Sequence, residues 1–486
     1  MLSISVVGNR LVNGAGETVR LLGVNRESTE YACTYGDVSS GPIDAGDAAA
    51  IAAWGADAVR VPLNEDCWLG INGLPADGLS AASYQAAIEG YVADLNADGI
   101  YAILDLHWSA PGTTPSGAQY PMPDDHSVPF WSSLAGAFAS NPAVVFDAFN
   151  EPYSPAADGW SGYPVSWSCW EDGGCTLPNE PDGTPPSANP LTYTAVGMQQ
   201  LVSAIRAAGA NQPIMLGGLS YANDLSQWLA YEPSDPDGQL VASFHNYNGE
   251  QCDDVNCWNA TIAPLAAQVP VVTGEFDEDD CPAGGGADPT NFDNTYMNWA
   301  DAHGISYLAW GWLVLSADPT CDKLTLIDDY SGTPADPNGV ALRAHLLALT
   351  PAAGATGGTS GPTTVTGTQP PSSNPPTPVE TLAELLRAPA LRRAGALLSG
   401  SALLEYAPSD AGTLTITIRH AGRLLARGSH SYSAGSAAEL AVRATGTGRR
   451  FLRRHAHASI KITAAFKALT GAGSSASLTT SLAAGS

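Results

Sequence analysis

The first 350 residues contain very few positively charged side chains. They hold 7 Lys or Arg against 43 Asp or Glu, which gives this part of the chain a net charge of −36 at pH 7. Such a surface repels phosphate backbones, so we expect no nucleic-acid partner, whereas an uncharged ligand is compatible with it. Residues 351–486 have the opposite balance, with 13 basic and 5 acidic residues and a net charge of +8. An asymmetry of this size predicts separate modules.

The sequence also has no apolar run that approaches the roughly 18 residues of a membrane-spanning helix, so we expect no membrane span. Its nine histidines show no HExxH or paired spacing, which predicts that no metal is bound. Two acidic clusters have a second interpretation, because hard cations bind grouped carboxylates. We interpret Asp124-Asp125-His126 as a loop with a helix cap, and the four acidic residues at 277–280 as a solvated loop.

All eight cysteines lie between residues 33 and 321. An even number without zinc-type spacing favours disulfides, and therefore a secreted or cell-surface protein, over reduced and buried thiols. Eight cysteines allow about a hundred connectivities, among which we favour pairing between neighbours in the sequence. That pairing joins Cys33 with Cys67, Cys169 with Cys175, Cys252 with Cys257, and Cys281 with Cys321.

Strand and helix patterns alternate over the first 350 residues. Short β-branched apolar runs predict strands, and the stretches between them predict helices. Eight such units fit a (β/α)8 TIM barrel. A doubly wound open sheet is the alternative, but no Gly-rich phosphate turn follows the first strand. The expected strands are 21–25, 57–62, 100–106, 144–150, 213–217, 240–246, 270–275 and 306–312. The expected helices are 44–54, 83–98, 128–140, 193–208, 258–268, 291–303 and 338–348, whereas 221–232 is ambiguous.

The two ends of the chain extend beyond this pattern. Residues 3–20 predict two short strands around an Asn13-Gly14 turn. Residues 351–379 consist almost wholly of Pro, Ala, Gly, Thr, Ser and Val, a composition typical of a flexible linker. Residues 380–486 alternate with period two at 414–419 and 460–463, which predicts a small all-β, sandwich-like domain after a helix near 380–394. We therefore expect a barrel over 1–350, a linker over 351–379 and a basic β-rich domain over 380–486.

Two of the expected barrel strands lead directly to a glutamate, Glu151 in one case and Glu275 in the other. The C-terminal ends of barrel strands meet at one face, which hosts the active site of this fold. Further polar or aromatic residues stand at the ends of other strands, and their convergence on one face is hard to obtain by chance. These residues are Asn25, Arg60, His107, Trp108, Asn150, His245, Tyr247 and Trp310.

Two facing carboxyl groups are what the cleavage of a glycosidic bond requires. One group gives a proton to the leaving oxygen, and the other attacks the anomeric carbon. Arg60 is suited to hydrogen-bond an ionised Glu275, and Asn150 is placed to bond the 2-hydroxyl of a sugar. Trp310 offers a flat apolar face for a sugar ring, and Asp105 is expected to support the site from behind.

The segment Phe149-Asn150-Glu151-Pro152 resembles the signature around the acid/base residue of glycoside hydrolase family 5, the large cellulase and mannanase family. The resemblance covers residues 4–348, and eight site residues recur in the family's order along the chain. It implies that Glu151 is the acid/base and Glu275 the nucleophile, that the mechanism is retaining, and that no cofactor is used. The other six matching positions are Arg60, His107, Asn150, His245, Tyr247 and Trp310.

We therefore expect a monomeric, retaining endo-β-glycosidase that hydrolyses a β-1,4-linked polysaccharide. An endo-β-1,4-glucanase (cellulase) is our first expectation, and a β-mannanase or another β-glycan hydrolase of the family is the second. A non-catalytic glycan-binding cell-surface protein is the alternative from another class, and it requires one carboxylate to be missing or misplaced. Residues 153–192 form an insertion rich in Trp and Tyr, which we expect to be a loop without regular structure that shapes the cleft.

The C-terminal module lacks the aromatic residues of the usual carbohydrate-binding domain. All 12 tryptophans lie before residue 313, and the aromatic residues beyond 380 are Tyr406, Tyr432, Phe451 and Phe466. The basic run at 449–455 instead predicts contact with an acidic surface, such as cell wall, insoluble substrate or the barrel itself. A charged, exposed face of a small β-domain is the alternative.

Overall fold

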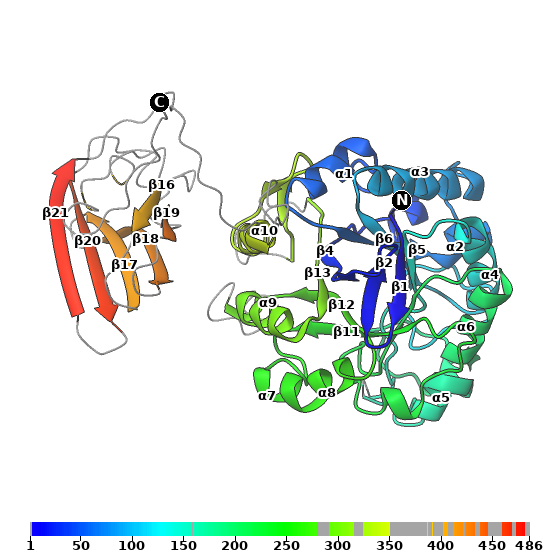
Figure 1. Cartoon of the computed structure of the whole chain (residues 1–486). Coiled ribbons are helices and arrows are strands. Elements are labelled where there is room, and N and C mark those ends of the chain that lie inside the picture. Colours follow the sequence, from blue (N-terminus) through cyan, green and yellow to red (C-terminus); the bar gives the residue numbers. More distant parts are fainter. Residues whose placement is uncertain are drawn as a thin grey trace, which may run out of the picture. The chain divides into compact units, whose positions relative to one another are not determined.

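The β-branched runs of the first 350 residues form eight parallel strands that close into a barrel in the computed structural model (Figure 1). The last strand of the barrel pairs with the first, β13 with β4, so the (β/α)8 prediction is confirmed. In the order of their neighbours around the barrel, the strands are β4 (Leu22–Asn25), β5 (Ala58–Asn64), β6 (Tyr101–Trp108), β7 (Val144–Asp147), β10 (Ile214–Gly217), β11 (Leu240–Tyr247), β12 (Val271–Asp277) and β13 (Ser306–Ala309).

The chain divides into two compact units, residues 1–357 and 358–486. The structure describes residues 2–157, 159–278, 291–314 and 324–349 of the first unit. In the second unit it describes residues 386, 391, 402–406, 412–420, 423–432, 438–445, 459–468 and 473–481. The linker expected over 351–379, most of the helix expected near 380–394, and the basic run at 449–455 lie outside the described residues.

The barrel has two apolar cores because side chains alternate between the two faces of a strand. On β6, Ala102 and Leu104 pack outward against the helices, whereas Tyr101 and Ile103 point into the barrel. The inner core also contains Val145, Met215, Val241, Val272 and Leu308. All of these side chains are nearly or fully buried, which fills the lower part of the barrel with apolar side chains.

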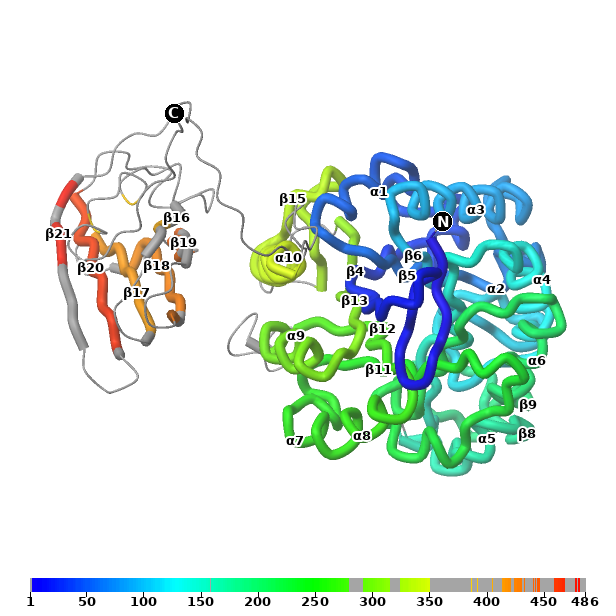
Figure 2. Tube along the Cα trace, in the orientation of Figure 1, coloured from blue at the N-terminus to red at the C-terminus, as the bar shows by residue number. Residues whose placement is uncertain are grey.

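An N-terminal antiparallel ribbon covers the inner core at the end of the barrel where the strands begin. It consists of β1 (Ile4–Val7), β2 (Arg10–Asn13) and β3 (Thr18–Val19), and its first two strands form the dark blue hairpin of Figure 2. Ile4 and Leu11 join the inner core, and the Ile4 N–H donates to the Pro142 carbonyl over 2.9 Å. The prediction of two strands around Asn13-Gly14 was incomplete. A third strand, β1, precedes them and is connected to β2 by a turn at Gly8-Asn9.

Helices surround the barrel, and capping residues fix where several of them begin (Figure 1). The Asp44 side chain accepts from the N–H groups of Gly46 and Asp47 at the start of α1, and Ser80 accepts from Ser83 N–H at the start of α3. The helical segments are η1 (Ala32–Tyr35), α1 (Ala45–Ala52), α2 (Glu65–Leu69), α3 (Ala81–Ala97), α4 (Ser127–Phe138), α5 (Trp167–Asp172), α6 (Met198–Ala207), η2 (Trp228–Ala230), α7 (Val255–Cys257), η3 (Trp258–Ile262), α8 (Ala263–Ala266), α9 (Asn291–His303) and α10 (Asn338–Leu349).

Two of the sequence expectations about the connections were wrong. The insertion at 153–192 contains regular structure, namely α5 and the strand β8 (Gly173–Pro178). The helix expected from 193 begins only at Met198, because the alternating segment β9 (Thr192–Val196) pairs with β8 instead. The ambiguous stretch 221–232 holds only the single turn η2. The remaining short pair in this unit is β14 (Ile327–Asp329) with β15 (Thr333–Pro334).

Three of the four predicted disulfides are present: Cys33–Cys67, Cys169–Cys175 and Cys252–Cys257. The fourth predicted pair, Cys281 with Cys321, lies outside the described residues. Within the described part of the chain, no helix combines the length and the apolar character needed to cross a membrane.

The described strands of the second unit form one six-stranded antiparallel sheet, which confirms the all-β prediction. Leu414, Ile416 and Ile418 are buried on one face of the sheet, and the residues between them are partly exposed. In spatial order the strands are β16 (Ala402–Tyr406), β19 (Ala438–Ala444), β18 (Arg423–Tyr432), β17 (Gly412–His420), β20 (Ser459–Ala468) and β21 (Gly473–Ser481).

Candidate active site

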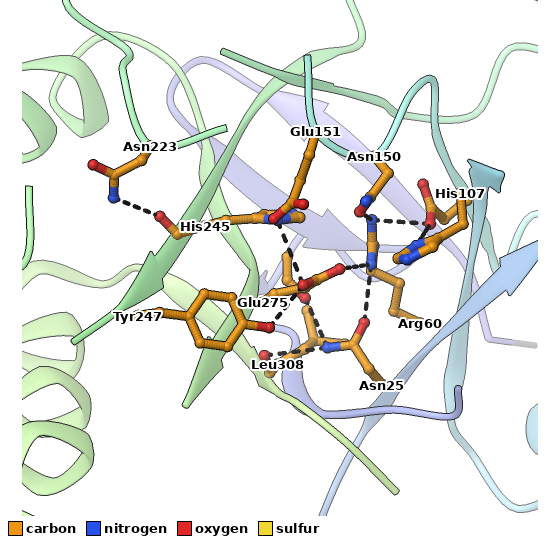
Figure 3. A network of polar contacts seen from close by, with 12 residues as sticks. Asn25, Arg60, His107, Asn150, Glu151, Asn223, His245, Tyr247, Glu275 and Leu308 are labelled. Atoms are coloured by element: carbon orange, nitrogen blue, oxygen red, sulfur yellow. Dashed lines mark hydrogen bonds and ion pairs between the residues drawn. The ribbon is translucent and has the colours of Figure 1, made fainter. Parts of the chain in front are cut away.

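Glu151 and Glu275 lie at the same end of the barrel and both face the ring of His245 (Figure 3). Glu275 belongs to β12, and Glu151 follows shortly after the end of β7. His245 Nδ1 is 2.8 Å from Oε1 of Glu151 and 3.6 Å from Oε2 of Glu275. One oxygen of each carboxylate and one ring nitrogen lie within 4.8 Å of one another. The two strand-end glutamates are therefore close enough to act on one bond.

An open cavity of about 360 Å³ lies over the two carboxylates. Three barrel strands, β6, β11 and β12, contribute to its walls, together with segments that follow β7, β11 and β13. Among the described residues, the cavity is lined by His107, Glu151, Tyr247, Asn248, Glu275, Trp310 and Leu324. The other polar residues that we expected at this site lie beneath the cavity floor, because Asn25, Arg60, Asn150 and His245 are each at most 1% exposed.

Arg60 is the centre of the buried layer beneath the cavity. Its Nη1 is 2.6 Å from Oε1 of Glu275, its Nη2 is 3.0 Å from Oδ2 of Asp105, and its Nε is 2.9 Å from Oδ2 of Asp147. Nη1 also donates to Asn25 Oδ1 and Nη2 to Asn150 Oδ1. Burial alone would lower the pKa of Arg60, but the three carboxylates raise it above its ordinary value. One permanent cation therefore orients the carboxylate of Glu275 from below.

Glu275 receives a second hydrogen bond from the side. The Tyr247 hydroxyl donates to Glu275 Oε2 over 2.8 Å. Burial, followed by the charge of Glu275, raises the pKa of Tyr247 well above its ordinary value, so this hydroxyl keeps its proton. With Arg60 on one oxygen and Tyr247 on the other, the carboxylate is held in a single orientation.

His245 requires a glycine at position 274. A Cβ built on Gly274 would lie 2.9 Å from His245 Nε2, which is closer than such atoms approach one another. Burial lowers the pKa of His245 to about 3 and that of His107 to about 4, so both rings are neutral at neutral pH. The 2.8 Å contact with Glu151 then assigns the proton of His245 to Nδ1, which donates to the carboxyl group.

Burial gives Glu151 a different environment from Glu275. It raises the pKa of the Glu151 carboxyl above its ordinary value, because the charged form loses its water. Hydrogen bonds from His245 and from the Gln119 side chain reach this carboxyl, but burial outweighs the lowering of its pKa by Gln119. A carboxyl group in this setting keeps its proton to a higher pH, as a general acid must.

The aromatic wall of the cavity is built by His107 and Trp310. Their ring centroids lie 5.5 Å apart and the rings are nearly parallel, at 15°. Asp105 Oδ2 is 2.7 Å from His107 Nδ1, so Asp105 supports the site from behind as we expected. Trp108 is not among the residues that line this cavity; its ring lies beside that of Tyr31, at 6.1 Å.

Two residues of the site escaped the sequence analysis. Gln119 Nε2 donates to the Glu151 carbonyl over 3.1 Å, and its Oε1 accepts from Asn150 Nδ2 over 3.2 Å. Gln119 lies in the loop after β6 and carries no strand-end signal. Asp147, the last residue of β7, bonds Arg60, and the alternation of that strand is the signal that places it inside the barrel.

Both acidic clusters differ from our expectation. His126 precedes α4 without a side-chain cap hydrogen bond, and Asp124 Oδ1 accepts from the His126 N–H over 2.9 Å instead of capping the helix. Asp277 and Glu278 were predicted to lie in a solvated loop, but they are 1% and 4% exposed. Asn338 at the start of α10 donates to Asp277 Oδ1 over 2.6 Å, and the Phe292 N–H donates to Glu278 over 3.0 Å. Contacts from distant helices therefore bury the first half of this acidic run, whereas 279–280 lie outside the described residues.

The model of the family Cellulase (glycosyl hydrolase family 5) matches residues 12–314. The chain belongs to glycosyl hydrolase family 5. It is therefore a glycoside hydrolase, which confirms the predicted enzyme class and the resemblance noted in the sequence. No curated protein sequence matches the chain.

Solved structures of family members agree with the barrel. A β-glucanase from Saccharophagus degradans in complex with cellotetraose shares 20% identity, over 72% of this chain and 94% of the other, with a TM-score of 0.53. The catalytic domain of the major endoglucanase from Xanthomonas campestris pv. campestris shares 17% identity, over 70% and 98% of the two chains, with a TM-score of 0.50. At this identity the likeness concerns the fold.

Proposed function

We propose that this family 5 chain is a retaining endo-β-glycosidase that hydrolyses β-1,4-linked polysaccharide, with β-glucan as its substrate. The observation that carries the proposal is the meeting of Glu151 and Glu275 at His245, within 4.8 Å. Retaining enzymes hold their two carboxyl groups at roughly 5–5.5 Å, whereas inverting enzymes need roughly 6.5–9.5 Å to admit a water molecule. The short separation supports direct attack by one of the glutamates.

The environments of the two glutamates support different roles. Glu275, bonded by Arg60 and Tyr247, is the nucleophile: its carboxylate attacks the anomeric carbon and forms a glycosyl ester. Glu151, whose pKa is raised by burial, gives its proton to the departing oxygen as the glycosidic bond breaks. Glu151 then takes a proton from water, the hydroxide adds to the anomeric carbon, and the ester bond to Glu275 breaks.

The choice of glucan over other polysaccharides rests on the similar solved structures. One of them is a β-glucanase complexed with cellotetraose, and another is an endoglucanase. The parallel rings of Trp310 and His107 offer a flat wall for a sugar ring. A β-mannanase is the second candidate, because it would use the same two carboxylates. A non-catalytic glycan-binding protein is disfavoured, since both carboxylates are present and their nearest oxygens lie within 4.8 Å of each other.

The test is reducing-end release from a panel of soluble polysaccharides: carboxymethyl-cellulose, mixed-linkage β-glucan, glucomannan, galactomannan and xylan. Glu275→Gln serves as the matched control, because it removes the nucleophile and keeps the shape of the side chain. We expect activity on the glucans that disappears in Glu275→Gln. Activity on mannans alone would keep the mechanism and change the substrate. No activity on any member would favour the binding protein.

We also propose that the protein acts outside the cell as a monomer, with a C-terminal module of residues 380–486 that contacts cell wall or insoluble substrate. Three disulfides support an oxidising compartment. The charge of +8 on residues 351–486 supports an acidic partner surface for the module. Co-sedimentation of the full chain with cell walls of reduced and normal anionic content tests this contact, and equal binding to both would contradict it.

A further inference from the structure

The connection that follows β10 contains three consecutive residues with a left-handed backbone. Ser220, Tyr221 and Ala222 have φ angles of 54°, 59° and 58°. None of them is a glycine, and in the described part of the chain the other non-glycine residues with positive φ stand singly. An L side chain in this region crowds the following carbonyl, so three such residues in a row persist only where their surroundings hold them. We call residues 220–222 the left-handed turn.

Backbone hydrogen bonds close the left-handed turn at its base. The Leu219 N–H donates to the Asp224 carbonyl over 3.1 Å, and the Asp224 N–H donates back to Leu219 over 2.8 Å. Ala222 is fully buried inside the turn, and a Cβ built on Gly217, the last residue of β10, would lie 3.2 Å from the Ala222 Cβ. The turn is therefore packed directly against the C-terminal end of β10, at the end of the barrel where the two glutamates lie.

The middle residue of the turn contacts the segment that carries Glu151. The Tyr221 N–H donates to the Pro152 carbonyl over 3.1 Å. The ring of Tyr221 also stacks on the ring of Tyr153, with centroids 4.8 Å apart and planes at 8°. Tyr221 therefore fixes both of the residues that follow Glu151 in the sequence, one through its backbone and the other through its side chain.

The next two residues along the chain contact the backbone of His245. The His245 N–H donates to the Ala222 carbonyl over 3.1 Å, and Asn223 Nδ2 donates to the His245 carbonyl over 2.9 Å (Figure 3). Asn223 is itself fixed, because its Oδ1 accepts from the Cys252 N–H over 2.8 Å. His245 Nδ1 donates to Glu151 Oε1 over 2.8 Å. The turn and the residue after it thus hold the backbone on both sides of the hydrogen bond between His245 and Glu151.

We propose that the left-handed turn positions the general acid, because it sets the separation of Glu151 and His245 and so directs the Glu151 carboxyl toward the leaving oxygen. The backbone angles of a residue fix the directions of its N–H and C=O groups. A turn that relaxed to a right-handed or extended path would therefore lose the bond to Pro152, the bond from His245, or both. A displacement of about 1 Å can cost about a hundredfold in rate. The inference rests on the role of Glu151 proposed above, and the turn itself exchanges no bond or proton.

The experiment compares variants of the full chain that oppose or tolerate the left-handed backbone. Ser220→Val and Ser220→Asn both change an exposed side chain, but a β-branched residue resists positive φ whereas asparagine tolerates it. Tyr221→Val makes the same backbone change at the next residue and is the second variant. Asp77→Val is the matched control, because the exposed Asp77 has a left-handed backbone (φ 49°) in the connection between α2 and α3.

Two substrates separate an effect on the acid from an effect on the whole site. On β-glucan, we expect kcat to fall at least about tenfold in Ser220→Val and Tyr221→Val, by about threefold or less in Ser220→Asn, and not to change in Asp77→Val. An aryl cellobioside with an acidic phenol needs no proton from Glu151, so its glycosidic bond cleavage should fall less than about twofold in every variant. A loss of stability alone would not distinguish the two substrates.

Proton exchange at His245 tests the turn without any substrate. NMR of the chain labelled with ¹⁵N-histidine observes the buried Nδ1–H of His245, whose signal is absent in His245→Gln. We expect this proton to exchange with water at least about tenfold faster in Ser220→Val than in the wild type or Ser220→Asn. If Glu151→Gln lost activity equally on both substrates, the proposed role of Glu151 would fail, whereas the exchange rate would still decide whether the turn holds His245 against Glu151.

Three outcomes would overturn the proposal. Equal losses of kcat in Ser220→Val and Ser220→Asn would show that the backbone conformation of the turn is not the cause. Equal losses on β-glucan and on the aryl cellobioside would show that the turn supports the whole site and not the acid. Unchanged kcat and unchanged proton exchange in folded Ser220→Val and Tyr221→Val would show that the strain only accompanies a short connection after β10. Thermal unfolding shows which variants are folded at the assay temperature.

Discussion

The lower and upper halves of the barrel interior come from the same strands but have opposite chemistry. Ala58, Ile103 and Val145 belong to the apolar inner core of the lower half. Two residues further along the same strands stand Arg60, Asp105 and Asp147, which are fully buried and ionisable. A single step of two residues therefore separates a conventional core from a charged layer on three neighbouring strands.

The lower half mainly stabilises the fold, whereas the upper half carries the charged groups of the candidate site. Apolar burial stabilises the lower half, whereas burying three carboxylates with one guanidinium opposes folding unless every partner is in place. Burial raises the pKa of Asp105 to about 7 and that of Asp147 well above its ordinary value. The charged layer of the upper half holds Glu275 in position through Arg60. Mutations in the two halves should therefore have different consequences.

The largest expected effects are on turnover, in the upper half. Glu275→Gln should lower kcat by at least about a thousandfold on every substrate, because the proposed nucleophile is lost. Glu151→Gln should lower kcat by about 10²–10⁴-fold on β-glucan, where the leaving alcohol needs a proton. On an aryl cellobioside with an acidic phenol, the rate of glycosidic bond cleavage should fall much less, because this leaving group needs no proton from the acid. Pre-steady-state release of the phenol measures that step.

The two variants control for each other, because both replace a glutamate at the same cavity. Equal losses on both substrates in Glu151→Gln would contradict its role as the acid. A rate close to that of the wild type in either variant would contradict the proposed mechanism.

Arg60→Met should combine the loss of activity with a large loss of stability. Removing the guanidinium leaves Asp105, Asp147 and Glu275 buried without their cation, which costs about 3–5 kcal/mol in a protein interior. The cost should fall below neutral pH, because burial raises the pKa values of Asp105 and Asp147 and these two carboxyls then take up protons. Urea unfolding at pH 7 and pH 5 measures both values. Arg20→Met is the control, because its pair with Asp301 is partly exposed and should be worth at most about 1 kcal/mol.

Ile103→Ala should affect stability without affecting chemistry. Ile103 is fully buried in the lower half, so its truncation should cost about 2–4 kcal/mol through lost contacts and the cavity left behind. Turnover per folded molecule should match the wild type at a temperature where both are folded. Ile103→Val, which removes one methyl group, should cost about 0.5–1.5 kcal/mol. A fall in kcat in step with the loss of stability would show that the two halves are not independent.

The alternation of inward and outward side chains along each barrel strand also made both halves predictable from the sequence. β-Branched runs with polar residues at their ends predicted the barrel strands and brought Arg60, His107 and Glu275 to one face. Gln119 was missed because it acts from a loop, where no periodicity fixes the direction of a side chain. The burial of Asp277 was missed because Asn338 reaches it from α10, and a contact at that sequence distance leaves no local pattern.

A smaller effect concerns the stability cost of Glu151. Because burial raises its pKa in the folded state, Glu151 stabilises the fold fully at low pH and loses this contribution as the pH rises through the folded-state value. Glu151→Gln cannot ionise, yet its side-chain oxygen can still accept from His245 Nδ1. The variant should therefore become more stable than the wild type as the pH rises from 4 to 8. Urea unfolding across this range checks the sign, with the exposed Glu17→Gln as control. A constant difference would contradict it.

The smallest expected effect comes from removing residues 351–486, which follow the last barrel strand and the last helix of the first unit in the sequence. The inner core and the carboxylate layer are complete within residues 4–308, and the described first unit has its own outer core as well. The shortened chain should therefore fold and hydrolyse soluble β-glucan with kcat and KM close to those of the full chain, whereas its binding to insoluble cell wall should fall. Parallel assays on soluble and insoluble substrate measure the two effects.

If kcat on soluble substrate collapsed while the unfolding midpoint stayed unchanged, the C-terminal module would have to act on the upper half of the barrel itself. The separation between a stabilising lower half and a self-sufficient catalytic upper half would then no longer hold.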